Sequence, residues 1–374
     1  MPPFAEARID LDAISANVAS LAGRAPGSRV MGVVKADGYG HGMLPAARAA
    51  LAGGATWLGT AFVSEALALR AAGIEVPVLA WILPPGEPLA AAVDAGIDLG
   101  ASALGTLDEI TATAHQTGRQ ARVHLKADTG LNRGGVAAGE WEAVVDAAAR
   151  AEADGLIKAV GVFSHFACAD EPGHPSIGAQ LSAFHSALEI ADKAGLRPEV
   201  RHIANSAATL TLPEAHFDLV RPGIASYGLS PIPALAGFGL RPAMTLSART
   251  ASVKRVPAGS GVSYGHRYVT DRETGLALVP LGYADGVPRA ATNIGPVFLG
   301  GKRRTIAGTV CMDQFVVDVG DDPVAPGDAT VIFGAGDNGE PTAQDWADVL
   351  DTISYEIVTR IGARVPRAYV GAAR

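Results

Sequence analysis

The chain has few cysteines and few charges for its length, and each shortage excludes a class of protein. Two cysteines, Cys168 and Cys311, in 374 residues form neither a disulfide framework nor the paired spacing of a zinc site. Lys and Arg number 30 against 38 Asp and Glu, without a basic tract, which argues against a nucleic-acid or membrane surface. No apolar run approaches the roughly 18 residues of a membrane helix, and the start of the chain lacks a signal-peptide pattern. We therefore expect a cytoplasmic protein that binds neither nucleic acid nor membrane.

Apolar residues are what the chain has in plenty. Hydrophobic residues make up 48% of the sequence and charged residues 18%, which excludes disorder over the whole chain and leaves ample material for a core. The length fits two domains, or one barrel of roughly 250 residues with a smaller partner.

Residues 12 to 230 alternate short apolar runs with alanine-rich amphipathic stretches. The predicted strands cover residues 30–34, 57–60, 76–83, 98–100, 122–126, 160–164, 200–203 and 219–221. The predicted helices cover residues 44–51, 64–72, 88–95, 140–153 and 179–194. Glycine follows most of these helices, as expected at a helix end. Such alternation requires a parallel sheet, and eight strands in about 220 residues favour a closed (β/α)8 barrel, the TIM barrel.

The pattern changes near residue 236, where alternating segments replace the alanine-rich helices. Segments 245–256, 275–279, 303–309, 314–319 and 329–333 predict antiparallel strands, and 343–350 predicts one helix. Residues 4–10 alternate as well and are expected to pair with these strands. We therefore predict a barrel over residues 10–235, and a mainly antiparallel β domain over 236–374 that includes an N-terminal strand within 1–9.

Polar residues that follow the predicted strands are the candidates for chemistry, because such barrels carry their active sites on these loops. Lys35 directly follows four apolar residues. A lysine partly removed from water there has a lowered pKa and can form an imine with a carbonyl compound. From position alone, an ion pair with a carboxylate such as Asp37 explains Lys35 equally well.

Two neighbouring loops carry the features of an anion site. Asn205 can cap a helix whose first turn offers free N–H groups, with the Ser206 hydroxyl beside them. Gly223 allows close backbone approach after the eighth strand, and these barrels commonly bind phosphate after strands seven and eight. Each feature alone fits an ordinary cap or turn, but together they favour a phosphate site. An imine-forming lysine opposite a phosphate site suggests pyridoxal phosphate.

Nine motifs, in consecutive order, resemble those of the alanine racemases. The first contains Lys35 in Val-Lys-Ala-Asp-Gly-Tyr-Gly-His-Gly, which resembles the cofactor-lysine motif of that family. The nine motifs span both predicted domains and cover residues 34–42, 126–133, 164–167, 205–207, 221–224, 262–265, 282–286, 311–314 and 353–356. Two departures touch no reacting group: Asp37-Gly38 stands where Asn-Ala is common, and Asn132 lies inside the Arg133 loop.

The resemblance implies a homodimeric enzyme that interconverts L- and D-alanine with pyridoxal phosphate, supplying D-alanine for peptidoglycan or, less often, serving alanine catabolism. Lys35 is the base on one face of the substrate, and Tyr264 of the partner subunit is the base on the other. Arg221 faces the pyridine nitrogen, and His165 links it to Tyr264. Taken alone, His165 fits a core histidine and Tyr264 fits a packed aromatic residue on a turn.

The resemblance also implies a set of binding residues and no metal site. The cofactor-binding residues are Lys35, Tyr39, His165, Asn205, Ser206, Arg221, Gly223, Ile224 and Tyr355. The substrate-binding residues are Arg133, Met312, Asp313 and Tyr283. Met312 and Asp313 come from the partner subunit, although Asp313 alone also fits a turn carboxylate. Lys126 is carbamylated in the family and orients Arg133.

Four other functions stay open at this point. A racemase that also accepts serine has the same motifs. A decarboxylase of the same architecture typically uses a catalytic cysteine and a carboxylate at the pyridine nitrogen, where this chain has Arg221. A cofactor-carrier protein is a single barrel without the β domain that bears Tyr264. A Schiff-base aldolase on the same barrel lacks the visible absorbance of the cofactor.

Overall fold

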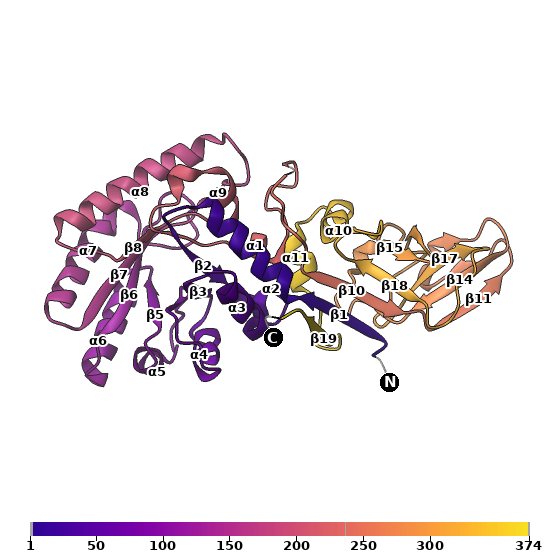
Figure 1. The fold of residues 1–374 in the computed structure, drawn as a ribbon, viewed down its shortest axis with the longest axis horizontal. Coiled ribbons are helices and arrows are strands. Elements are labelled where there is room, and N and C mark those ends of the chain that lie inside the picture. The colour runs from indigo at the N-terminus through magenta and orange to yellow at the C-terminus, as the bar shows by residue number, and fades with distance from the viewer. Residues whose placement is uncertain (1–2, 236, 373–374) are drawn as a thin grey trace.

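The computed structural model describes residues 3–235 and 237–372, which form two parts (Figure 1). The barrel runs from indigo to pink, and the β-rich part is orange to yellow, with strand β1 as an indigo exception. Residues 1–2, 236 and 373–374 lie outside the description. The predicted start of the second domain, residue 236, is among them.

The first part is an eight-stranded parallel sheet, as the sequence pattern predicts. Its strand order is β8-β7-β6-β5-β4-β3-β2-β9. The strands are β2 (Arg29–Val33), β3 (Trp57–Thr60), β4 (Val78–Ala80), β5 (Asp98–Ala101), β6 (Ala121–Lys126), β7 (Ile157–Phe163), β8 (Val200–His202) and β9 (Leu219–Val220). Two backbone hydrogen bonds join the ends of the sheet: Asp218 N donates to Arg201 O at 3.1 Å, and Arg221 N donates to Ala204 O at 2.9 Å. The sheet thereby closes into a barrel.

Helices alternate with these strands and surround the sheet (Figure 1). They are α1 (Leu11–Arg24), α3 (Met43–Ala52), α4 (Val63–Ala71), α5 (Leu89–Asp94), α6 (Leu104–Thr117), α7 (Ala138–Ala153), α8 (Pro175–Lys193) and α9 (Ser206–Thr211). Three shorter elements are α2 (Lys35–Tyr39), η1 (Pro213–Ala215) and η2 (Ile224–Tyr227). The predicted set lacks α1 and α6. Helix α1 ends at Ala25 without a glycine, and polar residues weaken the apolar pattern of α6.

The second part is mainly antiparallel. Its sheets have the orders β16-β15-β18-β10-β1-β19, β11-β14-β17 and β12-β13. The strands are β1 (Ala5–Asp10), β10 (Met244–Arg249), β11 (Ser252–Val256), β12 (Gly261–Val262), β13 (Tyr268–Val269), β14 (Thr274–Val279), β15 (Pro296–Leu299), β16 (Lys302–Thr305), β17 (Phe315–Gly320), β18 (Ala329–Phe333) and β19 (Arg367–Val370). Its helices are η3 (Tyr264–His266), η4 (Arg289–Ala291), α10 (Ala343–Leu350) and α11 (Ser354–Thr359).

Two predicted strand segments of the second part, residues 245–256 and 4–10, can be compared with the structure. The predicted single segment 245–256 is wrong, because β10 and β11 belong to different sheets and the chain turns at Thr250, whose N–H donates to Asp328 O at 2.8 Å. Strand β1 pairs antiparallel with β10 and parallel with β19. The alternating N-terminal segment thus lies inside the sheet of the second part, as expected.

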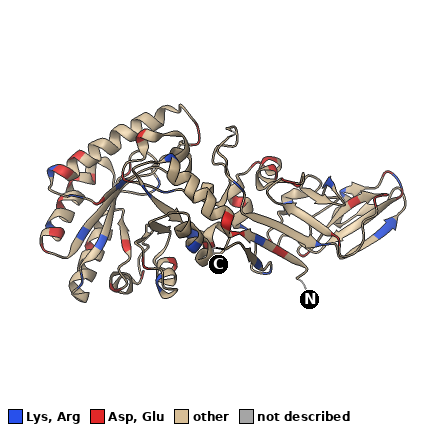
Figure 2. Ribbon diagram, viewed as in Figure 1, with Lys and Arg blue, Asp and Glu red and all other residues tan. Residues whose placement is uncertain are grey.

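The two parts share one core. A single cluster of buried apolar residues includes Ile9 and Met244 of the β-rich part and Leu11 and Val34 of the barrel. Lys and Arg are interspersed with Asp and Glu over both parts (Figure 2). Within the described residues, no helix combines the length and apolarity needed to span a bilayer.

Candidate active site

One group of the predicted site residues lies where barrel strands end. Lys35 begins α2 two residues after β2, Lys126 is the last residue of β6, and His165 follows β7. Ser206 begins α9 after β8, and Arg221 directly follows β9. Because the strands are parallel, their carboxyl ends meet at one rim, where such barrels carry out chemistry.

The backbone after Lys35 is left-handed. Ala36, Asp37, Gly38 and Tyr39 have φ values of 53, 53, 60 and 53°. This conformation costs L-residues roughly 1–2 kcal/mol each, so surrounding contacts must hold it. Asp37 Oδ1 accepts from Met43 N at 2.8 Å, and a carboxylate of α4, Glu65, accepts from Ala36 N at 2.7 Å. The strain is stored beside the lysine that we predict carries the cofactor.

Two lysines at the rim have lowered basicity. Burial lowers the pKa of Lys35, the charge of Arg133 lowers it further, and Glu65 opposes both. Burial, followed by Arg133 and Arg221, lowers the pKa of Lys126 to about 8. A lysine with a lowered pKa is more often in the neutral, nucleophilic form that imine or carbamate formation needs.

Arg221 lies buried in the barrel with hydrogen-bond acceptors on one edge. Its Nη2 donates to Ser164 O at 2.7 Å and lies 3.2 Å from His165 Nδ1, while Nη1 lies 2.9 Å from His202 Nδ1. Among the described residues, Nε has no hydrogen-bond partner and is free to face a ligand. Burial lowers the pKa of Arg221, yet a guanidinium starts so high that it stays charged. Burial and this charge bring the pKa of His165 well below its ordinary value, so His165 is neutral.

Ser206 and Gly223 form a cradle of small groups. Ser206 Oγ accepts from Gly223 N at 2.8 Å and from Ala225 N at 3.3 Å, which also places Ile224 at the cradle. A Cβ on Gly223 would lie 2.2 Å from Tyr39 Oη, so any side chain here must displace that phenol. Asn205 caps α9 by accepting from Ala208 N at 3.0 Å.

Tyr355 reaches the cradle from α11 of the second part, where its ring lies 6.2 Å from that of Tyr39. Burial raises the pKa of both phenols, and both are neutral donors at neutral pH.

The Arg133 loop is organised by a carboxylate. Asp128 Oδ1 accepts from Gly130 N at 2.9 Å and from Asn132 N at 3.1 Å. The hydroxyls of Thr129 and Ser164 lie 2.7 Å apart and tie the loop to the end of β7. The loop thus presents the exposed Arg133 near both lysines.

A second group of predicted site residues lies on the β-rich part of the same chain. Tyr264, Met312 and Tyr283 are 74, 53 and 43% exposed. Tyr264 O accepts from Thr309 Oγ1 at 2.7 Å, and Tyr283 N donates to Cys311 O at 3.0 Å.

Asp313 belongs to the same group. Its Oδ1 accepts from Arg364 Nη1 at 2.7 Å. The contacts described for these four residues lie within the β-rich part, so a single chain does not bring them to Lys35.

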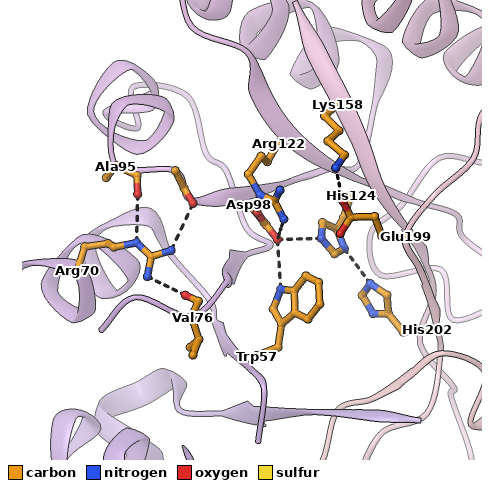
Figure 3. Close-up of polar contacts among 11 residues, drawn as sticks. Trp57, Arg70, Val76, Ala95, Asp98, Arg122, His124, Lys158, Glu199 and His202 are labelled. Carbon is orange, nitrogen blue, oxygen red and sulfur yellow. Dashed lines mark hydrogen bonds and ion pairs between the residues drawn. The ribbon is translucent and has the colours of Figure 1, made fainter. Parts of the chain in front are cut away.

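Three buried residues of the barrel interior escaped the sequence analysis. Asp98, His124 and His202 have no exposed surface and form a hydrogen-bonded line (Figure 3). His202 continues this line to Arg221. A signal was present, because β5 begins with an aspartate and β6 and β8 each contain a histidine. Their contact depends on the register of strands that are distant in sequence, which the pattern alone does not give.

The rim residues fit pyridoxal phosphate. Lys35, Lys126, Arg133 and Arg221 bring four positive groups together, which favours an anionic ligand. The small cradle of Ser206 and Gly223 suits a phosphate, and Lys35 suits an aldehyde. Arg221 Nε, without a partner among the described residues, suits a ring nitrogen.

Comparison with known proteins identifies the family. Residues 9–231 match the model of the alanine racemase N-terminal domain, and residues 243–369 match that of the alanine racemase C-terminal domain. The chain is 72% identical to the alanine racemase of Thermobifida fusca over 374 residues, which covers 100% of both proteins.

Solved structures agree with the sequence comparison. Alanine racemase from Streptomyces lavendulae, a producer of D-cycloserine, has a TM-score of 0.98 at 58% identity and covers 100% of this chain and 98% of its own. The enzyme from Streptomyces coelicolor has a TM-score of 0.97 at 60% identity, with 98% of each chain covered. With both domain models matched and these relatives aligned over nearly their full length, the chain belongs to the alanine racemase family.

Proposed function

We propose that this protein interconverts L- and D-alanine with pyridoxal 5'-phosphate attached to Lys35. The observation that carries the proposal is that a half-buried lysine of lowered pKa, the Ser206–Gly223 cradle and a buried arginine lie at one rim in a chain of this family. The bound cofactor supplies the electron sink that makes the α-proton of alanine removable. The protein supplies placement and the two proton carriers.

Lys35 and Tyr264 are the two bases in this proposal. When not bonded to the cofactor, Lys35 would be an amine of lowered pKa that can take or return the α-proton on one face. Tyr264 of a second subunit serves the other face. Since Arg221 Nη2 donates to His165 Nδ1, neutral His165 carries its proton on Nε2, from which it can donate to the Tyr264 oxygen.

Arg221 limits side reactions in this proposal. A guanidinium has no acceptor and stays charged, so it cannot share a proton with the ring nitrogen as a carboxylate does. Arg221 would thus leave the ring nitrogen unprotonated, and the cofactor would supply a weaker electron sink. We infer that reprotonation of the α-carbon is thereby favoured over transamination.

Arg133 holds the substrate carboxylate or the cofactor phenolate, and carbamylated Lys126 orients it. A neutral amine adds CO2 and releases one proton to water, and the resulting carbamate anion attracts Arg133, whereas an ammonium repels it. The lowered pKa of Lys126 favours the neutral amine. Tyr39, Asn205, Ser206, Gly223, Ile224 and Tyr355 form the phosphate shell in this proposal.

A homodimer completes the pocket. Tyr264, Met312, Asp313 and Tyr283 are exposed on one chain, and a second copy can present them to the rim of the first. The proposed role is cytoplasmic supply of D-alanine for peptidoglycan.

The decisive experiment starts from pure L-alanine. We expect loss of optical rotation to a racemic end point, with D-alanine quantified on a chiral column and L-serine as the comparison substrate. Reduction with borohydride should bleach the visible absorbance and fix the cofactor on the peptide that contains Lys35. A protein that leaves L-alanine unchanged, or whose adduct maps to another lysine, contradicts the proposal.

A further inference from the structure

A line of buried polar side chains crosses the barrel from β5 to the end of β9. Asp98 Oδ2 lies 3.2 Å from His124 Nε2, His124 Nδ1 lies 2.9 Å from His202 Nε2, and His202 Nδ1 lies 2.9 Å from Arg221 Nη1. Figure 3 shows its first three members. We name these four residues the Asp98–Arg221 relay.

The direction of every hydrogen bond in the relay follows from Arg221. A guanidinium only donates, so His202 Nδ1 must offer a lone pair and the His202 proton must lie on Nε2. That proton is donated to His124 Nδ1, which puts the His124 proton on Nε2 as well. His124 Nε2 then donates to Asp98, an acceptor at the far end. Both histidines are therefore neutral and in the same tautomer.

The direction of the hydrogen bonds in the relay requires Asp98 to be an acceptor, and its surroundings keep it as an anion. Burial alone raises the pKa of a carboxyl, but hydrogen bonds from His124 and Arg122 hold that of Asp98 below its usual value. Arg122 Nη2 donates to Asp98 Oδ2 at 3.4 Å, and Arg122 Nε donates to Asp98 Oδ1. Trp57 Nε1 donates to Asp98 Oδ2 at 3.2 Å. Three side chains thus fix the carboxylate in place.

The barrel interior is shaped around the two histidines. A Cβ on Gly161 of β7 would lie 2.2 Å from His124 Nδ1, so a glycine there makes room for the ring. The ring of Phe163 stacks on that of His202, with centroids 5.0 Å apart and an interplanar angle of 5°. This packing leaves each imidazole one orientation.

We propose that Asp98 is a positioning residue for the racemase reaction, which acts through His124 and His202 to fix Arg221 with Nε toward the ring nitrogen. The inference rests on the proposed function, in which Arg221 faces the cofactor. Without a lone pair on His202 Nδ1, Arg221 Nη1 loses its acceptor and the guanidinium can turn. The buried carboxylate thus acts on the chemistry without touching the substrate or the cofactor.

The first test reads the tautomers in the wild-type holoenzyme by 15N NMR of histidine-labelled protein. We expect both His124 and His202 to carry their proton on Nε2. A proton on His202 Nδ1 overturns the proposal, whatever any variant does.

The second test is Asp98→Asn, which removes the charge at nearly constant shape. We expect the His202 tautomer to become mixed and kcat to fall about tenfold or more, as for other substitutions that disturb the hydrogen-bond partner of a functional group. KM for alanine should stay within about threefold, because none of the four relay residues is among the proposed substrate-binding residues. Gly161→Ala should give the same pattern by displacing His124, and it replaces Asp98→Asn if that variant does not fold.

Glu199→Gln is the matched control. This carboxylate pairs with Lys158 outside the relay and is also drawn in Figure 3. Its kcat and tautomers should equal those of the wild type. Wild-type kcat in a folded Asp98→Asn or Gly161→Ala protein refutes the positioning role alone, whereas a wild type that does not racemise alanine refutes the proposed function.

Discussion

The chemistry of the rim is set by single side chains, four of which are basic: Lys35, Lys126, Arg133 and Arg221. Lys35 and Lys126 have lowered pKa values because burial and Arg133 both disfavour the ammonium form. A site with this many basic groups favours bound anions, which balance its charge. A phosphate, a substrate carboxylate and a carbamate are the three anions that the proposed function brings to it.

The carbamate on Lys126 can be measured directly. With a pKa of about 8, its neutral fraction rises between pH 7 and 9, roughly two pH units below an ordinary lysine. We expect a 13C carbamate signal from protein equilibrated with 13C-labelled bicarbonate, increasing over this range. Lys126→Arg should abolish the signal. Absence of a carbamate signal from the wild type across this range contradicts the assignment.

Gly223 tests the cradle. In Gly223→Ala the new Cβ meets Tyr39 Oη at 2.2 Å and displaces the phenol from the phosphate position. We expect the Kd for pyridoxal phosphate to rise about tenfold or more, a loss of about 1.4 kcal/mol, in an absorbance titration of apo-protein.

A glycine of helix α8, Gly178, provides the control, because nothing lies within 4 Å of a Cβ built there. Gly178→Ala should keep the wild-type Kd and stabilise the fold by up to about 1 kcal/mol. Equal affinity in both variants means that the phosphate binds elsewhere.

The sequence predicts which residues lie at the rim better than it predicts the buried residues that hold them in place. Lys35, Asn205 and Gly223 can be predicted from the neighbouring sequence, because they lie at a strand end, at a helix cap and at a close approach of the backbone, respectively. Asp98 and His202 gain their meaning only from contacts between strands, which local patterns do not encode.

Among the individual elements, the left-handed turn after Lys35 has the clearest energetic cost. Ala36 has φ 53° and ψ 52°, a backbone conformation that is strained for alanine and unstrained for glycine. Ala36→Gly should therefore raise the free energy of unfolding by up to about 1 kcal/mol, measured from urea midpoints of the apo-protein.

The opposite result is expected in an ordinary helix. Ala143 is an exposed residue of α7, and Ala143→Gly should lower the free energy of unfolding by about 1 kcal/mol. If both variants lose stability alike, the left-handed turn carries no strain.

The elements themselves are largely predictable from apolar runs. The eight barrel strands all appear near their expected positions, because alternating strands and helices permit only a parallel sheet. The error at 245–256 arises because two strands with the same alternation, β10 and β11, follow each other closely. Which sheet each joins depends on partners such as β18 and β14.

The whole-molecule prediction concerns shared pockets. Lys35→Ala and Tyr264→Phe should each be inactive, because each removes one of the two bases. Mixing them in equal amounts should restore about one quarter of the wild-type activity, since half of the dimers are hybrids with one intact pocket of two.

Subunit exchange must be shown separately, for example by native mass spectrometry of differently labelled chains. A mixture of Lys35→Ala with itself is the control and should stay inactive. Hybrid dimers without activity contradict a pocket built from two chains.

The position of β1 has a consequence for how the molecule is made. This strand lies between β10 and β19, and Ala7 N donates to Pro366 O at 3.0 Å. Because β1 is translated long before β19, its second edge stays uncovered until β19 has left the ribosome. The six-stranded sheet can therefore be completed only after all the barrel strands, which lie between β1 and β19 in the chain, have been translated.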